Sequence, residues 1–353
     1  MINGNNVGGV ENAIEAKGLY KSFGEPFSLK RIFKLPYEIY QRLTGGYKKK
    51  QVLRDLSFAV ESGAVVGFLG PNGAGKSTTL KVMLNLIRKD AGECRVLGFN
   101  TRFDYDRALQ KTGALVELPV FYEYMTGYDN LLVTSNIFKF ITPPAIEESL
   151  KRVGLWEHRN KKVSQYSTGM RQKLYVAKIL LMRPSVIILD EPTSGMDPKG
   201  QAEMREIIRG LSKDGDITIL VSSHLLYEIE LVSDYVVIIK EGTVVTYGRV
   251  NELLSTDCEI YELEVGQDQT ETCVEFLRRF DFVEEARPVS RANVPAIFLK
   301  LKKDCAQRLP KELVAGGFDI FNYTRSKKSL EDFFLEVTAE DGSPSAGTRG
   351  DAA

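Results

Sequence analysis

Cysteine is scarce in this chain: only four are present among 353 residues, and no two of them form a CxxC pair. Scattered cysteines in this number argue against a disulfide framework and against a structural zinc site, so we expect a reducing compartment. An excess of charge of one sign is also missing, because 47 Lys and Arg balance 47 Asp and Glu. Without a global basic excess, we expect no nucleic-acid partner.

Long apolar runs are absent as well. The sequence has no stretch of about 18 apolar residues, so it predicts no membrane-spanning helix. Residues 1–12 contain neither a basic n-region nor an apolar h-region, and they do not resemble a secretory signal. We expect this polar N-terminus and the polar tail, residues 340–353, to be flexible.

The composition that remains is typical of a globular protein, with 43% hydrophobic and 27% charged residues. The length suits about two domains of roughly 100–200 residues each. Short β-type runs (13–19, 52–60 and 64–69) precede a helical pattern at 76–87, and β-type runs return at 186–190, 218–223 and 235–240. Between them, residues 118–183 are mostly helix-like. This order predicts an α/β fold with a mostly parallel sheet core and a helical subdomain.

A second unit is predicted from residue 256 to residue 339. Three strand-like runs alternate there with three helical runs, beginning with EIYELEV and ending with SLEDFFLEVT. About 80 residues are enough for a small α+β domain. The first unit is then expected to span residues 13–255.

A phosphate-binding loop follows the apolar run AVVGFL and opens the helix at Lys76. Its sequence fits GxxxxGK(S/T), and its residues are Gly70, Pro71, Asn72, Gly73, Ala74, Gly75, Lys76 and Ser77. Glycines let successive backbone N–H groups turn toward phosphate oxygens, and the helix N-terminus adds its positive dipole end. We expect Lys76 to contact the β- and γ-phosphates and the Ser77 hydroxyl to bind Mg²⁺.

An acidic pair ends the buried run VIILD. Asp190 stands at the carboxyl end of this strand, where ligands of parallel sheets bind, and Glu191 follows it. Asp190 can hold Mg²⁺, directly or through water, and Glu191 can orient and partly deprotonate an attacking water. Two solvated charges at a strand end are the alternative interpretation.

Four further motifs indicate which family of phosphate-loop proteins this chain resembles. The signature segment, residues 166–173 (YSTGMRQK), resembles the LSGGQ signature of ABC ATPases. The D-loop segment, residues 194–197 (SGMD), follows the acidic strand, His224 follows TILVSS, and the aromatic Phe23 lies in KSFG. In this order, over residues 13–250, the chain resembles the ATP-binding subunit of an ABC transporter. SLEDFFLEVT and ALVELPVFYEYMTGYDNLL resemble the drug, bacitracin and lantibiotic exporter branch.

The resemblance implies a P-loop ABC cassette that adds an antiparallel β subdomain to the parallel core and the helical subdomain. It also implies ATP and Mg²⁺ as cofactors, and an ATP-hydrolysing motor that drives a separate membrane permease from the cytoplasmic face of the membrane. ATP would close a head-to-tail dimer of two copies and hydrolysis would reopen it. The implied catalytic residues are Glu191 and His224, and the implied magnesium ligands are Ser77, Glu117 and Asp190. The implied nucleotide contacts are Phe23, the loop residues Gly70 to Ser77 with Thr78, and Ser167, Gly169 and Asp197.

The chain departs from the family at several positions. Tyr166, Thr168 and Met170 replace the usual Leu, Gly and Gln of the signature, whereas Ser167 and Gly169 are kept. Glu117 replaces the usual Q-loop glutamine, and its full negative charge alters the local electrostatics at a metal site. Thr168 limits backbone freedom and is expected to tune the ATPase rate.

A basic insert, residues 25–50, lengthens a connection that is short in most cassettes. Residues 27–50 carry seven Lys and Arg against one acidic residue, Glu38, a net charge of +6. Several apolar residues there are spaced roughly for one helix face, interrupted at Pro36. One prediction is that the insert contacts an anionic membrane surface or the permease. The alternative is a solvent-exposed loop that packs on its own cassette.

Three aromatic residues near the Glu117 loop, Phe121, Tyr122 and Tyr124, are candidates for permease docking, with core packing as the alternative. An ABC ATPase outside transport is a second functional hypothesis, although the chain lacks the second cassette or coiled coil of such proteins. A P-loop kinase is the third, and the signature segment and His224 argue against it.

Overall fold

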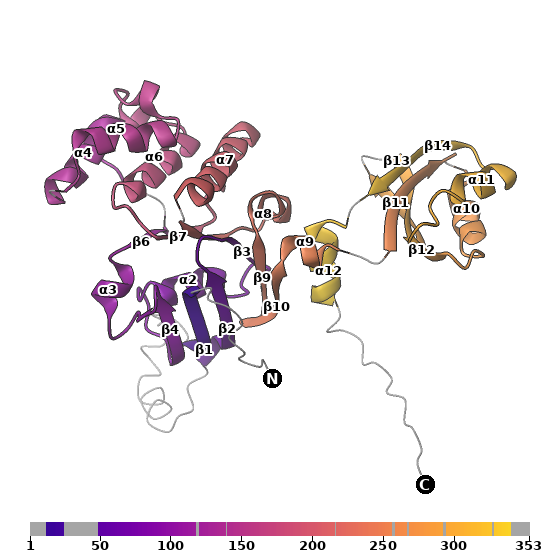
Figure 1. Cartoon of the computed structure of the whole chain (residues 1–353), viewed down its shortest axis with the longest axis horizontal. Coiled ribbons are helices and arrows are strands. Elements are labelled where there is room, and N and C mark those ends of the chain that lie inside the picture. Colours follow the sequence, from indigo (N-terminus) through magenta and orange to yellow (C-terminus); the bar gives the residue numbers. More distant parts are fainter. Residues whose placement is uncertain are drawn as a thin grey trace, which may run out of the picture. The chain divides into compact units, whose positions relative to one another are not determined.

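The structure is a computed structural model of the chain (Figure 1). It describes residues 12–24, 49–117, 120–138, 140–215, 217–255, 258–266, 268–291, 294–326 and 328–339. The predicted flexible ends, apart from Asn12, and almost all of the basic insert lie outside the described residues. Within the described part of the chain, no helix is long and apolar enough to cross a membrane. The chain divides into two compact units between Val250 and Asn251.

A six-stranded mixed sheet forms the centre of the first unit, with the order β10-β9-β3-β8-β7-β6. Five neighbouring strands are parallel, and only β10 runs antiparallel to its neighbour β9. Their bounds are β3 Val65–Leu69, β6 Thr112–Leu115, β7 Val186–Asp190, β8 Thr218–Ser222, β9 Tyr235–Lys240 and β10 Thr243–Arg249. Central strands such as VVGFL are apolar throughout, because both faces of a parallel sheet are covered.

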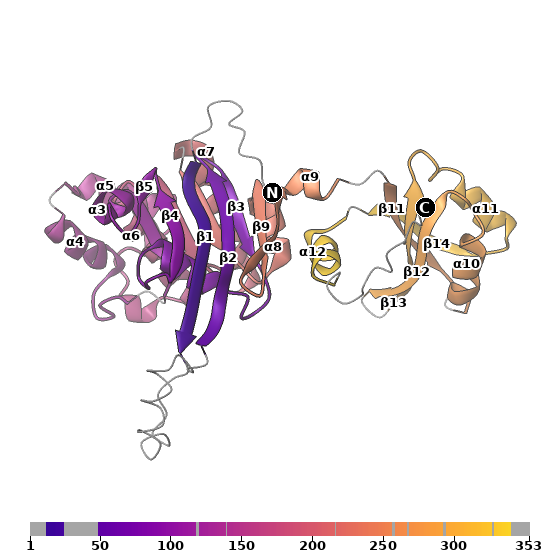
Figure 2. The ribbon, with the colours of Figure 1, turned by 90° about the horizontal axis from the view of Figure 1, so that it is seen from below.

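A four-stranded antiparallel sheet, β2-β1-β4-β5, is the second layer of this unit, and Figure 2 shows its long strands β1 and β2 side by side. The bounds are β1 Asn12–Gly24, β2 Lys49–Glu61, β4 Ala91–Val96 and β5 Phe99–Asn100. Strand β2 begins at Lys49, so the last two residues of the predicted insert already belong to a strand. The register places Lys50 opposite Phe23.

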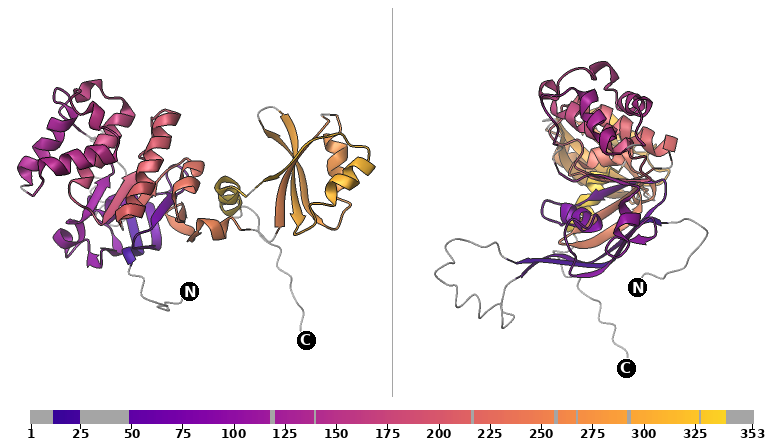
Figure 3. Two further views of the ribbon diagram at one scale, coloured as in Figure 1. Left: turned by 45° about the horizontal axis from the view of Figure 1, so that its top comes forward. Right: turned by 90° about the vertical axis from the view of Figure 1, so that its left-hand side faces the viewer.

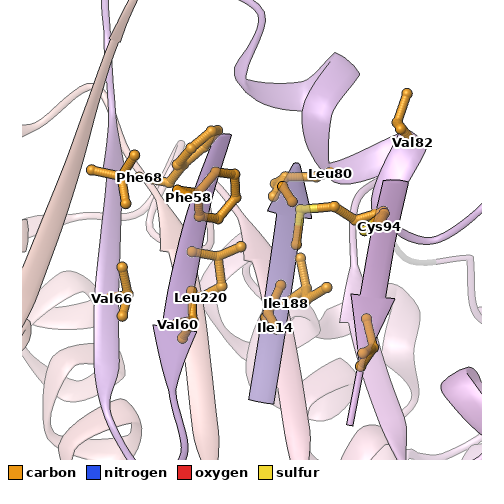
Figure 4. Close-up of a cluster of buried hydrophobic side chains, with 14 of the residues drawn as sticks. Ile14, Phe58, Val60, Val66, Phe68, Leu80, Val82, Cys94, Ile188 and Leu220 are labelled. Atoms are coloured by element: carbon orange, nitrogen blue, oxygen red, sulfur yellow. The ribbon is translucent and has the colours of Figure 1, made fainter. Parts of the chain in front are cut away.

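The main core lies between these two sheets (Figure 4). Ile14 of β1 and Cys94 of β4 face Ile188 and Leu220 of the parallel strands, and Leu80 of helix α2 (Lys76–Met83) completes the layer. Burying a large apolar side chain contributes about 1.5–3 kcal/mol, so this layer fixes the loop that precedes α2 against both sheets.

Helices pack around the parallel sheet. Helices α4, α5 and α6 contact one another and form the helical part (Figure 1), α7 contacts α6 and α8, and α8 contacts β3. The bounds are α3 Tyr105–Leu109, α4 Gly127–Ile137, α5 Pro143–Arg152, α6 Thr168–Leu180, α7 Pro198–Gly215, α8 Leu226–Val232 and α9 Val250–Leu253. Two 3-10 turns, η2 Trp156–His158 and η3 Val163–Gln165, connect α5 to α6.

The second unit is a β-α-β-β-α-β module whose sheet has the order β12-β13-β11-β14. This is the split βαβ arrangement of ferredoxin-like domains, with α10 and α11 against one face of the sheet (Figure 3). The bounds are β11 Cys258–Val265, α10 Thr270–Leu277, β12 Val283–Arg291, β13 Val294–Lys302, α11 Leu309–Ala315 and β14 Ile320–Ser326. Helix α12, Leu330–Ala339, follows the module.

Strand β12 was missing from the predicted pattern. Its sequence, VEEARPVSR, is polar and contains Pro288, and it forms an edge of the sheet. Edge strands tolerate proline and lack a strong apolar alternation, which hides them in a sequence. The predicted fold class is confirmed: a mostly parallel core with an antiparallel sheet, a helical part and a small α+β unit.

Candidate functional site

The phosphate loop joins β3 to α2 and is shaped by two glycines. Gly75, at the start of the helix, has a left-handed φ of 108°, which glycine adopts without strain. A Cβ on Gly70 would lie 2.4 Å from the carbonyl oxygen of Ile239. Any larger residue there would push the loop away from β9. The short motif is therefore fixed by contacts with a strand about 170 residues further along the chain.

Lys76 lies inside this loop and is almost fully buried, with 7% of its surface exposed. Its Nζ donates to the carbonyl oxygen of Gly70 at 2.6 Å and to that of Pro71 at 3.4 Å. Burial lowers the pKa of Lys76 below its usual 10.5, and the nearby carboxylates of Glu191 and Asp190 oppose that shift. The lysine is thus a desolvated cation held ready in the loop.

A cavity of about 540 Å³ opens in front of the loop. This volume is in the range of small-molecule sites. Eight of the residues predicted from the sequence line it: Phe23, Asn72, Gly73, Gly75, Lys76, Ser77, Thr78 and Glu191. The cavity therefore joins the aromatic ring, the phosphate loop and the proposed catalytic carboxylate. Gly70, Pro71, Ala74, Asp190 and His224 lie in the surrounding loops and strand ends without lining it.

Five lining residues were not predicted: Lys50, Gln51, Val52, Arg54 and Glu241. The first four lie on β2, opposite the end of β1 that carries Phe23. Glu241 belongs to the β9–β10 turn, which hydrogen-bonds the loop because Gly242 N donates to Ala74 O at 3.0 Å. The pairing of the strand after the insert with β1 could have indicated Lys50, but no local signal points to Glu241.

The ends of β7 and β8 bring the acidic pair and the histidine together. Nδ1 of His224 lies 2.5 Å from Oε2 of Glu191. At the last residues of these two strands, the Ser222 hydroxyl donates a hydrogen bond to Oδ1 of Asp190 at 2.5 Å. His224 and Glu191 keep 49% and 29% of their side chains exposed, so a ligand can reach both. Asp190 is positioned by the neighbouring strand instead of being a freely solvated charge.

The backbone of Glu191 is in the left-handed region, with φ of 50°. A non-glycine residue holds this conformation only when its surroundings impose it. Here the Glu191 N–H donates to both the carbonyl oxygen and the Oγ of Ser222, each at 3.1 Å. Strand β8 thereby aims the Glu191 carboxylate at the cavity.

Glu117 is placed differently from the other predicted magnesium ligands. It is exposed, does not line the cavity, and accepts from Nζ of Lys81 at 3.0 Å. In the described part of the chain, no cluster of three or more His, Cys, Asp or Glu could hold a metal ion by itself. Ser77 and Asp190 remain near the loop as oxygen donors.

The signature segment and the D-loop segment form a second cluster. Ser167 caps α6, because its Oγ accepts from Met170 N at 3.2 Å. Gly169 packs against Met196, and Nε2 of Gln172 donates to Ser194 O at 3.2 Å. Asp197 caps α7 through its Oδ1, which accepts from Gly200 N. None of these residues lines the cavity of its own chain.

The structure explains the unusual Tyr166. Its ring is buried and its hydroxyl donates to the carbonyl oxygen of His158 at 2.8 Å. A Cβ on Gly127, at the start of α4, would lie 2.2 Å from that hydroxyl. The larger side chain at position 166 is thus accommodated by a glycine 39 residues earlier.

The three candidate docking aromatics have different surroundings. Phe121 is half-buried and packs edge-on against Tyr175 of α6, with ring centroids 6.2 Å apart. Tyr122 and Tyr124 are exposed and contact each other. Only the two tyrosines are therefore free to meet a partner.

Comparison with known proteins identifies the family of this chain. Residues 53–194 match the ABC transporter family. The chain is 35% identical over 300 residues to the ABC transporter ATP-binding protein YhcH of Bacillus subtilis (strain 168), covering 85% of this chain and 95% of that protein. It is 36% identical to the bacitracin transport ATP-binding protein BcrA of Bacillus licheniformis, and the match covers 84% of this chain and 95% of that protein. The lantibiotic transport ATP-binding protein SrtF of Streptococcus pyogenes is 37% identical over 205 residues, with 58% and 87% covered.

Solved structures have the same fold. The ATP-binding subunit of an ABC transporter superposes with a TM-score of 0.54 at 25% identity, covering 68% of this chain and 91% of that one. An ATP-binding cassette solved as a dimer in a post-hydrolysis state with ADP and Pi superposes with a TM-score of 0.55 at 21% identity, covering 67% and 98%. The predicted family is confirmed: this chain belongs to the ABC transporter family, as an ATP-binding and ATP-hydrolysing subunit.

Proposed function

We propose that this chain is the motor of an exporter and drives a separate permease from the cytoplasmic face of the membrane. The observation that carries the proposal is the pair of Glu191 and His224, where Glu191 lines the same cavity as the phosphate loop. A carboxylate and an imidazole at that place are suited to orienting water against a terminal phosphate.

The loop residues would bind ATP. The residues at the start of α2 line the cavity, where their backbone N–H groups would bind phosphate, and Phe23 lines it too and would offer a face on which adenine can stack. Nζ of Lys76 contacts two carbonyl oxygens of the same loop, and a bound phosphate oxygen would take the place of one of them. A phosphate would also replace the solvation that burial removes from this cation.

The residues present fit a magnesium ion. Mg²⁺ in nucleotide sites is held by one or two protein oxygens together with phosphates and waters, so a dedicated cluster of acidic residues is not required. Ser77 and Asp190 would supply these oxygens, and the ion would neutralise charge on the phosphates. Asp190 is already oriented by Ser222. Glu117 would be a further ligand once its ion pair with Lys81 opens.

A second copy of the chain would complete each site. Ser167 and Thr168 are exposed at the start of the 13-residue helix α6, where N–H donors and the helix dipole favour an anion. Because neither they nor Gly169 and Asp197 line the cavity of their own chain, we propose that they cover the ATP of the partner. Repulsion between the products would then open the dimer.

The permease would dock on the exposed Tyr122 and Tyr124, which follow Glu117 by five and seven residues in the sequence. If the Glu117 loop moves when Mg-ATP binds, that movement would displace Tyr122 and Tyr124 and so reach the permease. Relatives named for transport of bacitracin and of a lantibiotic support peptide antibiotics as the substrate class. The predicted contact of the basic insert with anionic lipid stays a proposal, and the net charge of +6 over residues 27–50 supports it.

The test is to co-express the chain with the membrane protein encoded beside it and to reconstitute the purified complex in vesicles. We expect the two proteins to co-purify and ATP hydrolysis to rise in the complex. Replacing Tyr122 and Tyr124 by Ser should abolish co-purification without changing ATP affinity. Hydrolysis by the chain alone, with no membrane protein bound under any nucleotide condition, would instead support an ABC ATPase outside transport.

The insert is tested separately. Residues 28–48 are replaced by a short glycine bridge, and both forms are sedimented with vesicles that contain anionic lipid. Each cation near the surface contributes up to about 1 kcal/mol, and this attraction weakens as salt rises. Equal sedimentation of both forms would exclude lipid contact by the insert.

A further inference from the structure

Three charged side chains are buried among the residues that the structure describes: Lys76, Lys173 and Glu228. Lys76 belongs to the phosphate loop. Each of the other two forms an ion pair with helix α7, although they lie on different neighbouring helices. Buried charges require a partner, so both pairs fix the position of α7 strongly.

Glu228 lies in the first turn of α8 and pairs with Arg205 of α7. The two side chains are only 9% and 19% exposed. Oε1 of Glu228 accepts from Nη1 of Arg205, whereas Oε2 is buried and makes no hydrogen bond to the described residues. Glu228 is the single buried carboxylate in the described part of the chain. Its charge therefore relies on one guanidinium.

This anchored turn directly follows His224. The Leu225 N–H donates to Oγ of the buried Ser223 at 2.9 Å, and the Glu228 N–H donates to Leu225 O at 3.1 Å. On its other side, α8 packs against β3 through Ile229, where Gly67 leaves no room for a Cβ. The backbone that carries the imidazole is thus held between β8 and the Glu228 turn.

We propose that Arg205 and Glu228 are positioning residues that hold the His224 imidazole against Glu191. The inference rests on the proposed function, in which that imidazole faces the terminal phosphate. The D-loop residue Asp197 caps helix α7, which begins at Pro198, and Figure 1 shows α7 beside α8. The pair therefore connects the helix that follows the D-loop to the turn that follows His224. Loss of the pair frees the turn and lets His224 leave Glu191.

A second ion pair with a buried partner lies on the other side of α7. Lys173 of α6 pairs with Glu203, two positions before Arg205. Residues two apart in a helix point about 200° apart, so these pairs leave α7 on opposite sides. The Lys173–Glu203 pair connects α7 to α6, and the Arg205–Glu228 pair connects α7 to the first turn of α8.

The experiment replaces both partners, Arg205→Met with Glu228→Met, because a single replacement would leave a buried charge unpaired and could unfold the protein. The matched control is Lys173→Met with Glu203→Met, on the same helix. The chain has two histidines, so a His158→Gln background leaves His224 as the single imidazole in a ¹H–¹⁵N spectrum. ATP affinity, kcat and the melting temperature are measured for each form.

We expect the Arg205/Glu228 variant to remain folded and to bind ATP within about twofold of the parent, while kcat falls at least about tenfold. Its His224 resonances should move to those of a solvent-exposed, unpaired imidazole, and those of the Lys173/Glu203 control should not move. Unchanged His224 resonances would overturn the inference, as would a fall in kcat that only parallels loss of ATP affinity and melting temperature. If the parent itself hydrolyses no ATP, the proposed function fails, whereas the His224 spectrum still decides whether the pair positions the imidazole.

Discussion

Nδ1 of His224 and Oε2 of Glu191 are 2.5 Å apart, although 33 residues separate them in the sequence. The contact exists because β7 and β8 are parallel neighbours whose carboxyl ends meet at one edge of the sheet. Their register pairs Asp190 with Ser222, so the residues that follow, Glu191 and His224, emerge side by side. A geometry set by a sheet is rigid, which suits groups that must hold a water in line with a phosphate.

Glu191→Gln should keep ATP binding and remove turnover. The amide has the shape of the carboxylate but cannot accept a proton from water, and loss of one general base costs about 10²–10⁴ in rate. The ATP-bound dimer should then accumulate and elute early in size-exclusion chromatography with ATP. Glu147→Gln, on the exposed face of α5, is the control and should behave as the parent. Hydrolysis near the parental rate would remove Glu191 from the role of base.

Lys76→Met should weaken ATP binding without loosening the nucleotide-free fold. Methionine keeps the length of the side chain and suits a buried site, but it lacks the charge-assisted contact with phosphate. Such hydrogen bonds contribute about 1.5–3 kcal/mol, so calorimetry should show an affinity at least about tenfold lower. Unchanged affinity would place the lysine outside the phosphate site.

The same variant tests the lowered pKa of Lys76. Burial lowers this pKa below 10.5, so the folded protein binds fewer protons than the unfolded chain in the window just below that value. Stability of the nucleotide-free protein should therefore rise there as pH increases, relative to Lys76→Met. Chemical denaturation of both proteins over this window measures the difference. Parallel stability curves for the two proteins would contradict the shift.

Much of this site could be predicted from the sequence because its signals are local. The loop glycines, Lys76 and Ser77 lie within eight consecutive residues, and Glu191 follows a recognisable buried strand. Phe23, singled out by the family resemblance, lines the same cavity as the loop. Where function depends on consecutive backbone N–H groups, a short motif carries most of the information.

The remaining features depend on contacts between distant segments. The Glu117 carboxylate pairs with Lys81, a half-buried residue of α2 that no motif indicates. Glu241 reaches the cavity only because the β9–β10 turn packs on the phosphate loop. Tyr166 departs from the signature pattern and is accommodated by Gly127. Each of these required the tertiary structure, because pairing between distant segments leaves no periodic trace in one sequence.

The four thiols should fall into two classes. Cys94 and Cys273 are buried, and burial raises their pKa from 9.0 to about 12 and about 11, respectively. Cys258 and Cys305 are partly exposed. Since the thiolate is the reactive form, a disulfide reagent at pH 8 should titrate two thiols in the native protein and four after unfolding.

The same shifts set a pH dependence of stability. A thiol whose pKa is raised by folding contributes stability below pH 9, and this contribution is lost as pH rises through 9 toward the folded value. The Cys94→Ala variant should therefore lose less of its folding stability than the parent as pH rises above 9. Rapid labelling of all four thiols in the native protein would contradict the buried positions.

Gly127→Ala should destabilise the first unit, because its new Cβ would lie 2.2 Å from the Tyr166 hydroxyl. Overpacking of this kind costs about 1–3 kcal/mol and should lower the melting temperature. Gly210→Ala is the matched control, since it also places alanine in a helix but meets no atom within 4 Å. There, alanine should stabilise by about 0.5–1 kcal/mol through its higher helix propensity.

A double-mutant cycle locates the clash of Gly127→Ala. Tyr166→Leu removes the hydroxyl and its hydrogen bond to His158 O, and should be destabilising in the parent. In the Gly127→Ala background the same change also removes the clash, so the double variant should be more stable than the two single effects added together. Strict additivity would mean that the added Cβ is accommodated by movement of α4, and that Tyr166 and Gly127 are not a coupled pair.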